Sequence, residues 1–122
     1  TKRIVKALSN PNVDIFFHPT TRIINRRGPI DFDFIEILKA AKKYKVALEI
    51  NSYPDRLDLH DTMIRQAIEA GVKLVINSDA HHTSHFRYLH LGEAQARRGW
   101  AGKSDVLNTK PAEELLKYFA SK

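Results

Sequence analysis

Cysteine is absent from the 122 residues of this chain, which excludes both disulfides and thiolate metal sites. Any bound metal must therefore be held by His, Asp or Glu side chains. No apolar run approaches the length of a membrane span, and no signal peptide is visible. We therefore expect a cytoplasmic protein without membrane contact. The length suits one domain and not two.

Acidic residues are the minority among the charged ones. The chain has 14 Asp and Glu against 20 Lys and Arg, which gives a formal net charge of +6. Such a balance is compatible with a polyanionic partner, and equally with an ordinary solvated surface. Charge alone therefore does not identify the chemistry.

The start of the chain predicts a fragment of a longer protein. The first residue is Thr1 and not Met, and residues 1–8 have a helical pattern with Ile4, Val5 and Leu8 on one face. We therefore expect the chain to begin inside a structural element.

Three short apolar runs, at 13–17, 47–51 and 72–77, are predicted to be β-strands. They do not alternate between apolar and polar residues, which is typical of parallel strands buried on both faces. A helical segment follows each run, so the order predicts an α/β fold with three parallel βα units and a helical tail.

The helices between the strands show their own boundary signals. Asp31 is the expected N-cap of the first connecting helix, and Asp58 or His60 is expected to begin the second, which ends at Gly71. Two short helical pieces are predicted at 86–91 and 92–98. A last amphipathic helix is expected to carry Pro111 in its first turn.

Ligand-competent side chains follow or end each predicted strand, namely His18, then Glu49 and Asn51, then Asp79 and His81. In parallel α/β folds, chemistry collects at the carboxyl ends of the strands. A carboxylate and an imidazole two residues apart point the same way and suit a divalent transition metal such as Zn or Mn. The alternative for Asp79-Ala80-His81 is a strand that ends in a polar turn.

Glu49 lies inside an apolar strand, where an unpaired carboxylate would be costly. It should therefore face a cation or a strong hydrogen-bond donor. The alternative is an ion pair with an arginine such as Arg56.

Several motifs together resemble the PHP (polymerase and histidinol phosphatase) superfamily, and more narrowly the C-terminal PHP domain of bacterial and archaeal family-X DNA polymerases. The motifs are Phe17-His18-Pro19-Thr20-Thr21-Arg22, Ala47-Leu48-Glu49-Ile50-Asn51, Pro54-Asp55-Arg56-Leu57-Asp58-Leu59 and Ser78-Asp79-Ala80-His81-His82. The segments 96–100 and 105–109 also resemble the tail of that subgroup.

The resemblance implies a distorted (β/α)7 TIM-like barrel with two or three divalent metal ions, Mn or Zn. By motif, His18, Asp79 and His81 match metal ligands, while Glu49 and Asn51 match groups that line the site. Residues 1–122 would form the C-terminal portion of a single PHP domain. The N-terminal half of the barrel, with its early His-x-His motif, is not in this chain.

Two positions depart from the family pattern. Phe17 stands where a glycine usually precedes the His-Pro pair, and Tyr53 stands where a histidine usually precedes Pro-Asp-Arg. The second departure puts in doubt any role that the family assigns to that histidine.

The implied function is metal-assisted phosphodiester hydrolysis, as a 3′–5′ exonuclease in DNA repair. In this interpretation Asp79 is catalytic as well as a ligand, and Glu49 orients the attacking water. Arg22 and Arg56 are candidates for clamping the phosphate, with surface or loop salt bridges as the alternative. His82 is expected to face substrate or solvent without binding metal.

Two other functions stay open, a histidinol-phosphatase-like enzyme for small molecules and a catalytically silent DNA-binding or structural module. The expected partners are single-stranded or gapped DNA, the N-terminal half of the PHP domain and a polymerase domain. Three strands cannot close a barrel, so we also expect the isolated chain to be inactive and to self-associate through exposed strand edges.

Overall fold

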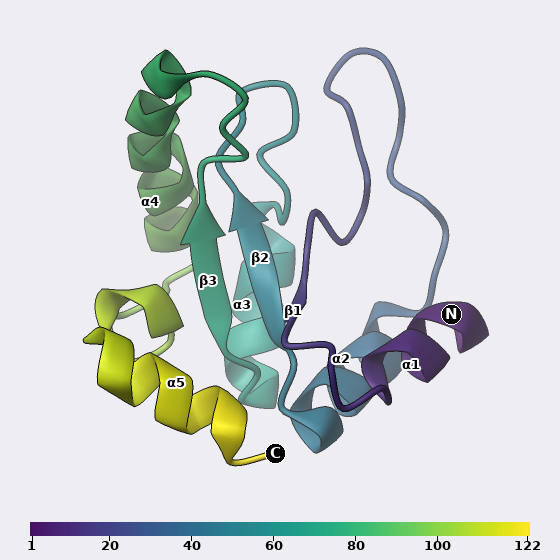
Figure 1. The fold of residues 1–122 in the computed structure, drawn as a ribbon. Helices are drawn as coiled ribbons and strands as arrows, with labels where there is room; N and C mark the ends of the chain where they lie inside the picture. Colours follow the sequence, from purple (N-terminus) through teal and green to yellow (C-terminus); the bar gives the residue numbers. More distant parts are fainter.

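A computed structural model describes residues 1–122. Its centre is a parallel sheet in the order β1 (Ile15–Phe16), β2 (Ala47–Asn51) and β3 (Leu74–Asn77). The arrowheads in Figure 1 point the same way, toward the loops at the top of the molecule. The α/β fold with three parallel strands is therefore confirmed. The sheet is open, so the partial barrel stays a prediction.

The register aligns the carboxyl ends of the two longer strands. Asn51 lies opposite Asn77, and Leu48 lies opposite Leu74. The first strand is shorter than the predicted 13–17, because the Val13 N–H donates to a turn carbonyl and His18 has a φ of +30°. The residues that follow the three strands therefore lie at one end of the sheet.

Helices surround this sheet on two sides and along one edge. The bounds are α1 Lys2–Leu8, α2 Phe34–Tyr44, α3 Asp61–Ala70, α4 Leu89–Arg98 and α5 Ala112–Ala120, with short 3-10 helices η1 Thr83–Tyr88 and η2 Leu107–Thr109. In Figure 1, α3 lies behind the sheet, α2 lies at the lower right, α4 runs beside β3, and α5 lies at the lower left near the amino ends of the strands.

The helix boundaries correct two predictions. Asp33, and not Asp31, is the N-cap of α2, because it directly precedes the first helical residue and its side chain accepts from the Glu36 N–H at 3.0 Å. The second connecting helix begins after His60 and ends at Gly71, whose φ is +78°, as predicted. In the tail, the predicted break at 92 is wrong, since α4 continues through Gly92.

The main apolar core lies between the sheet and the helices behind it. Leu48, Ile50 and Leu74 pack there against α2 and α3 and are fully buried. A smaller core on the other face joins Ala47 and Val75 to α5. Because side chains alternate along a strand, the positions after Ala47 and Val75 on that same face are Glu49, Asn51 and Asn77.

The outer edge of β3 is covered by the segment that follows α4. The Leu74 N–H donates to the Asp105 carbonyl at 2.9 Å, and Leu74 bridges Val106 in parallel. β1 has no strand on its outer side. None of the helices combines the length and the apolarity that crossing a bilayer requires.

Candidate active site

The Glu49 carboxylate joins the three strand ends. Its Oε2 accepts from the His18 backbone N–H at 2.6 Å and from Asn51 Nδ2 at 3.2 Å, and its Oε1 accepts from Asn77 Nδ2 at 3.0 Å. The residue is only 2% exposed. The expected strong donors are therefore present, but they are amides, and the alternative ion pair with Arg56 is wrong.

Asn77 was not among the predicted site residues. It lies two residues before Asp79, and its alternation places it on the same face of the sheet as Glu49. This period-two spacing is the signal that could have identified it. Asn51 completes the arrangement, because its Oδ1 accepts from the Tyr53 N–H at 3.0 Å while its amide group donates to Glu49.

His18 presents an uncommitted nitrogen beside this carboxylate. Its Nδ1 is buried and has no hydrogen-bond partner. Its backbone is left-handed, with a φ of +30°, at the point where β1 turns into its loop. A buried imidazole nitrogen without a partner is a rare arrangement and suits a ligand atom.

Asp79 and His81 lie together where β3 ends. Asp79 has a φ of +54°, and its Oδ2 lies 3.6 Å from Arg56 Nε. His81 Nδ1 lies 2.7 Å from the Asp79 carbonyl oxygen. Because a carbonyl only accepts, Nδ1 carries the proton and Nε2 offers its lone pair, which is how metal-binding histidines are commonly oriented.

Asp58 ties the loop after β1 to the loop after β2. Its Oδ2 accepts from the Thr20 and Thr21 N–H groups at 2.9 and 3.0 Å, and its Oδ1 is buried without a partner. Burial raises the pKa of the Asp58 carboxyl, while the Thr20 hydrogen bonds and the charge of Arg22 offset part of that rise. No sequence signal points to a contact across 38 residues.

Arg22, in the loop after β1, also binds the loop after β2. Its Nε donates to the Arg56 carbonyl at 2.7 Å, and its guanidinium also donates to the Leu57 carbonyl. The forked donor set is thus used on main-chain oxygens. Among the predicted phosphate-binding arginines, Arg56 lines the open cavity at this end of the sheet, whereas Arg22 holds the loop that carries it.

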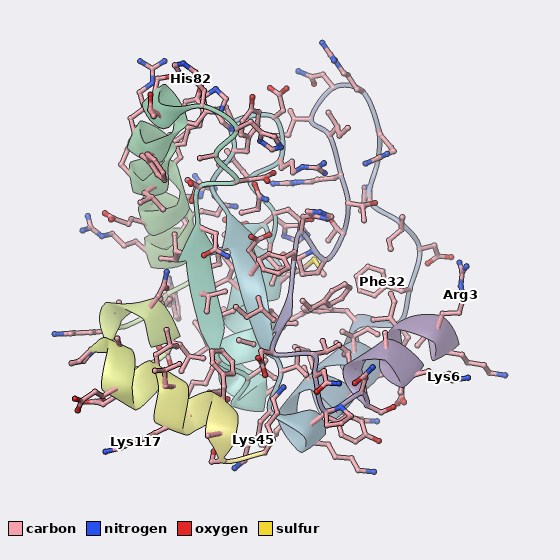
Figure 2. The ribbon with its side chains drawn as sticks, in the orientation of Figure 1. Arg3, Lys6, Phe32, Lys45, His82 and Lys117 are labelled. Atoms are coloured by element: carbon pink, nitrogen blue, oxygen red, sulfur yellow. The ribbon has the colours of Figure 1, made fainter.

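His82 lies at the outer rim, where Figure 2 labels it near the top of the molecule. It is exposed and is the N-cap of η1, because its Nδ1 accepts from the Ser84 N–H at 3.2 Å. The ring therefore has a local structural role and keeps Nε2 open to solvent.

No protein-family profile matches the chain. The chain is 40% identical over 114 residues to the DNA polymerase/3′-5′ exonuclease PolX of Bacillus subtilis (strain 168), which covers 93% of this chain and 20% of that protein. It is 38% identical over 87 residues to a probable phosphatase of Thermoanaerobacter sp. (strain X514), covering 66% of this chain and 33% of that protein. A probable phosphatase of Caldanaerobacter subterraneus subsp. tengcongensis is 36% identical over 87 residues.

The chain belongs to the PHP superfamily. The similarity to both groups of relatives confirms the resemblance that the strand-end motifs carry. The chain spans 20% of the length of the polymerase relative and 33% of the phosphatase relative. It corresponds to part of a PHP domain.

The three predicted metal ligands of this PHP segment share one end of the sheet without forming a complete site. No group of three or more His, Asp or Glu side chains is placed to hold an ion. Asp79 is paired with Arg56, while His18 and His81 each have an open ring nitrogen. The donor types fit a divalent transition metal, but this set alone is incomplete.

Proposed function

We propose that this PHP segment is part of a metal-dependent phosphoesterase that cleaves DNA as a 3′–5′ exonuclease in repair. One observation carries the proposal. The buried, unpartnered Nδ1 of His18 and the Asp79–His81 pair occur at the same end of the sheet, in a chain similar to a protein named as a polymerase and exonuclease. The remaining PHP portion and a polymerase domain would be its covalent partners.

His18, Asp79 and His81 would supply ligands for Mn or Zn, with two or three ions in the complete domain and further ligands from outside this chain. A bound ion would polarise the phosphoryl oxygens and lower the pKa of a bound water. The chain's own residues prepare the site. Glu49 fixes the His18 backbone, and the Asp79 carbonyl fixes the His81 tautomer.

The cavity beside these residues encloses about 290 Å³ and is lined by Arg56, Asp79 and His81 among others. Arg56 balances the charge of Asp79 and can turn its remaining N–H groups toward a phosphate, since a guanidinium has five donors. For Glu49, which was predicted to orient the attacking water, we propose instead that it positions His18. The two Glu49 oxygens already accept three hydrogen bonds.

A small-molecule phosphatase is the second candidate, favoured by the names of the probable phosphatases. The third, a silent DNA-binding module, is motivated by the incomplete ligand set of this chain. Substrate choice separates these functions.

The test compares the full-length protein with its Asp79→Ala variant, using Mn²⁺ and either single-stranded DNA or p-nitrophenyl phosphate. We expect DNA hydrolysis in the parent and a loss of about 100-fold or more in the variant, with lower metal content. Asp31→Asn, which alters an exposed loop carboxylate, is the matched control and should keep both. Hydrolysis of the monoester alone would favour the phosphatase, and undiminished DNA hydrolysis in Asp79→Ala would refute the assigned role.

A further inference from the structure

Four aromatic or imidazole rings gather beside the cavity at the carboxyl end of the sheet. The Tyr53 ring meets the rings of His81, His85 and Tyr88 edge-on, at centroid distances of 6.3, 5.4 and 5.4 Å. The His85 and Tyr88 rings stack at 5.2 Å with an interplanar angle of 26°. Tyr53 and His81 also line the cavity. We call these four residues the ring cluster.

The ring cluster is not part of the folding core. None of its members belongs to either apolar core, and all four are at least partly open to solvent. It lies around η1, at the end of the molecule where Figure 2 labels His82. Aromatic rings that gather at an exposed surface beside a cavity mark a binding site more often than rings buried in a core do.

The lining of the same cavity also carries two arginines and two carboxylates. These are Arg26 and Arg56, and Asp55 and Asp79. Arg56 is matched by Asp79, whereas no carboxylate lies within ion-pair distance of Arg26, which is exposed in the long loop after β1. Figure 1 shows this loop rising to the same end of the molecule. A guanidinium that forms no ion pair, in a cavity that two of the rings also line, suits a ligand with a phosphate and a flat apolar group.

We propose that the ring cluster binds one unpaired nucleobase and that Arg26 meets the phosphate of the same nucleotide. Every base has a π-face, so stacking on aromatic side chains tolerates any sequence. At about 290 Å³, the cavity is near the lower limit for small-ligand pockets, and it suits one nucleotide better than a base pair. The inference rests on the proposed function, because it names the part of a DNA strand that the phosphoesterase site receives.

The test measures binding and not turnover. Fluorescence anisotropy measures how tightly the full-length protein, in EDTA, binds a 5′-labelled single-stranded oligonucleotide. The 3′ end of the oligonucleotide is either a thymidine or an abasic sugar. We expect the parent to bind the thymidine end at least about fivefold more tightly. Tyr53→Leu should abolish that preference, and Tyr53→Phe should keep it, because phenylalanine retains the ring.

Trp100→Leu is the matched control, since Trp100 is 69% exposed and follows the far end of α4. It should leave the preference unchanged. If Tyr53→Leu does not fold, His85→Ala takes its place with the same expected loss. Equal affinity of the parent for the two oligonucleotides, or a preference that survives in the ring-deleting variant, overturns the stacking site.

Adding Mn²⁺ to the same oligonucleotides separates this inference from the proposed function. Base-dependent binding without nucleotide release supports the stacking site and contradicts the phosphoesterase. Nucleotide release without any base preference supports the phosphoesterase and overturns the stacking site.

Discussion

The side-chain amide of Asn108 pairs with both backbone polar groups of Ile76. Its Oδ1 accepts from the Ile76 N–H at 3.0 Å, and its Nδ2 donates to the Ile76 carbonyl at 2.7 Å. Ile76 lies in β3, so the amide occupies the place that a peptide group of a further strand would take. Together with the Leu74–Val106 bridge, it closes the edge of the sheet against pairing with a second chain.

Asn108→Ala should therefore open this edge. We expect the free energy of unfolding to fall by about 1 kcal/mol, because two backbone groups exchange the amide for water. Amide hydrogen exchange at Ile76 should accelerate, and light scattering should show more self-association. Asn12→Ala, in an exposed loop, is the control. Exchange at Ile76 as slow as in the parent would mean that the amide does not protect the edge.

Gly92 allows α4 to approach β2 and β3 closely. A Cβ at this position would lie 2.0 Å from Ser52 Oγ and 2.7 Å from Ile76 Cγ2, distances that no structure tolerates without movement. Gly92→Ala should therefore destabilise the protein by about 1–3 kcal/mol or more in thermal or urea unfolding. Gly28→Ala has open space around its new methyl group and should stay within about 0.5 kcal/mol of the parent. Equal stability of the two variants would contradict the close packing of α4.

The sequence was sufficient for the strand framework because local patterns determine it. The apolar run 47–51 is β2 with the predicted bounds, and His60 and Gly71 delimit α3 as predicted. The prediction of the helical tail was less accurate. A glycine normally weakens a helix, but at position 92 its missing side chain is what lets α4 pack against the sheet.

The site was predictable only as a set of positions. His18, Asp79 and His81 could be assigned to strand ends from their order along the chain. The partners that fix them could not be assigned, because the contacts of Asp58 with Thr20 and of Arg22 with Arg56 join segments more than 30 residues apart. Such hydrogen bonds depend on loop geometry, which hydrophobic periodicity does not encode.

Asp58 should make stability depend on pH in an unusual direction. Its pKa is raised above the ordinary value of 3.8, so between 3.8 and the raised value the folded protein binds more protons than the unfolded one. The free energy of unfolding contributed by this group therefore falls as pH rises through that window. Asp58→Asn should remove this slope in urea titrations. Plots of the free energy of unfolding against pH that run parallel for parent and variant would contradict the assignment.

Asp61 provides the comparison of opposite sign. Its pKa is lowered, mainly by the hydrogen bond from Arg98, whose Nη2 lies 3.0 Å from Asp61 Oδ2. Its contribution is therefore present above pH 3.8 and is lost as pH falls below it. Asp61→Asn should remove a decline in the free energy of unfolding at acid pH. It should leave the pH dependence that Asp58 contributes unchanged.

Glu49 offers a test of whether its charge or only its hydrogen bonds matter. Glu49→Leu would leave three buried N–H donors without an acceptor and should cost about 3 kcal/mol or more. Glu49→Gln keeps one acceptor oxygen for His18 and Asn51, and a flip of the Asn77 amide can accept from the new Nε2. The isosteric variant should therefore fold with a loss of about 1 kcal/mol or less.

The rate at which the Glu49→Gln variant hydrolyses DNA then tests the role of the carboxylate. Because both oxygens of Glu49 are held by amide donors and the residue is 2% exposed, we expect it to position His18 without acting on the substrate. The rate of DNA hydrolysis with Mn²⁺ should accordingly fall by less than about tenfold. That is the lower end of the loss seen when a residue that only orients a metal ligand is removed. Metal content and the pH profile should stay close to those of the parent. A well-folded Glu49→Gln protein as inactive as Asp79→Ala would show instead that the charge of Glu49 takes part in the chemistry.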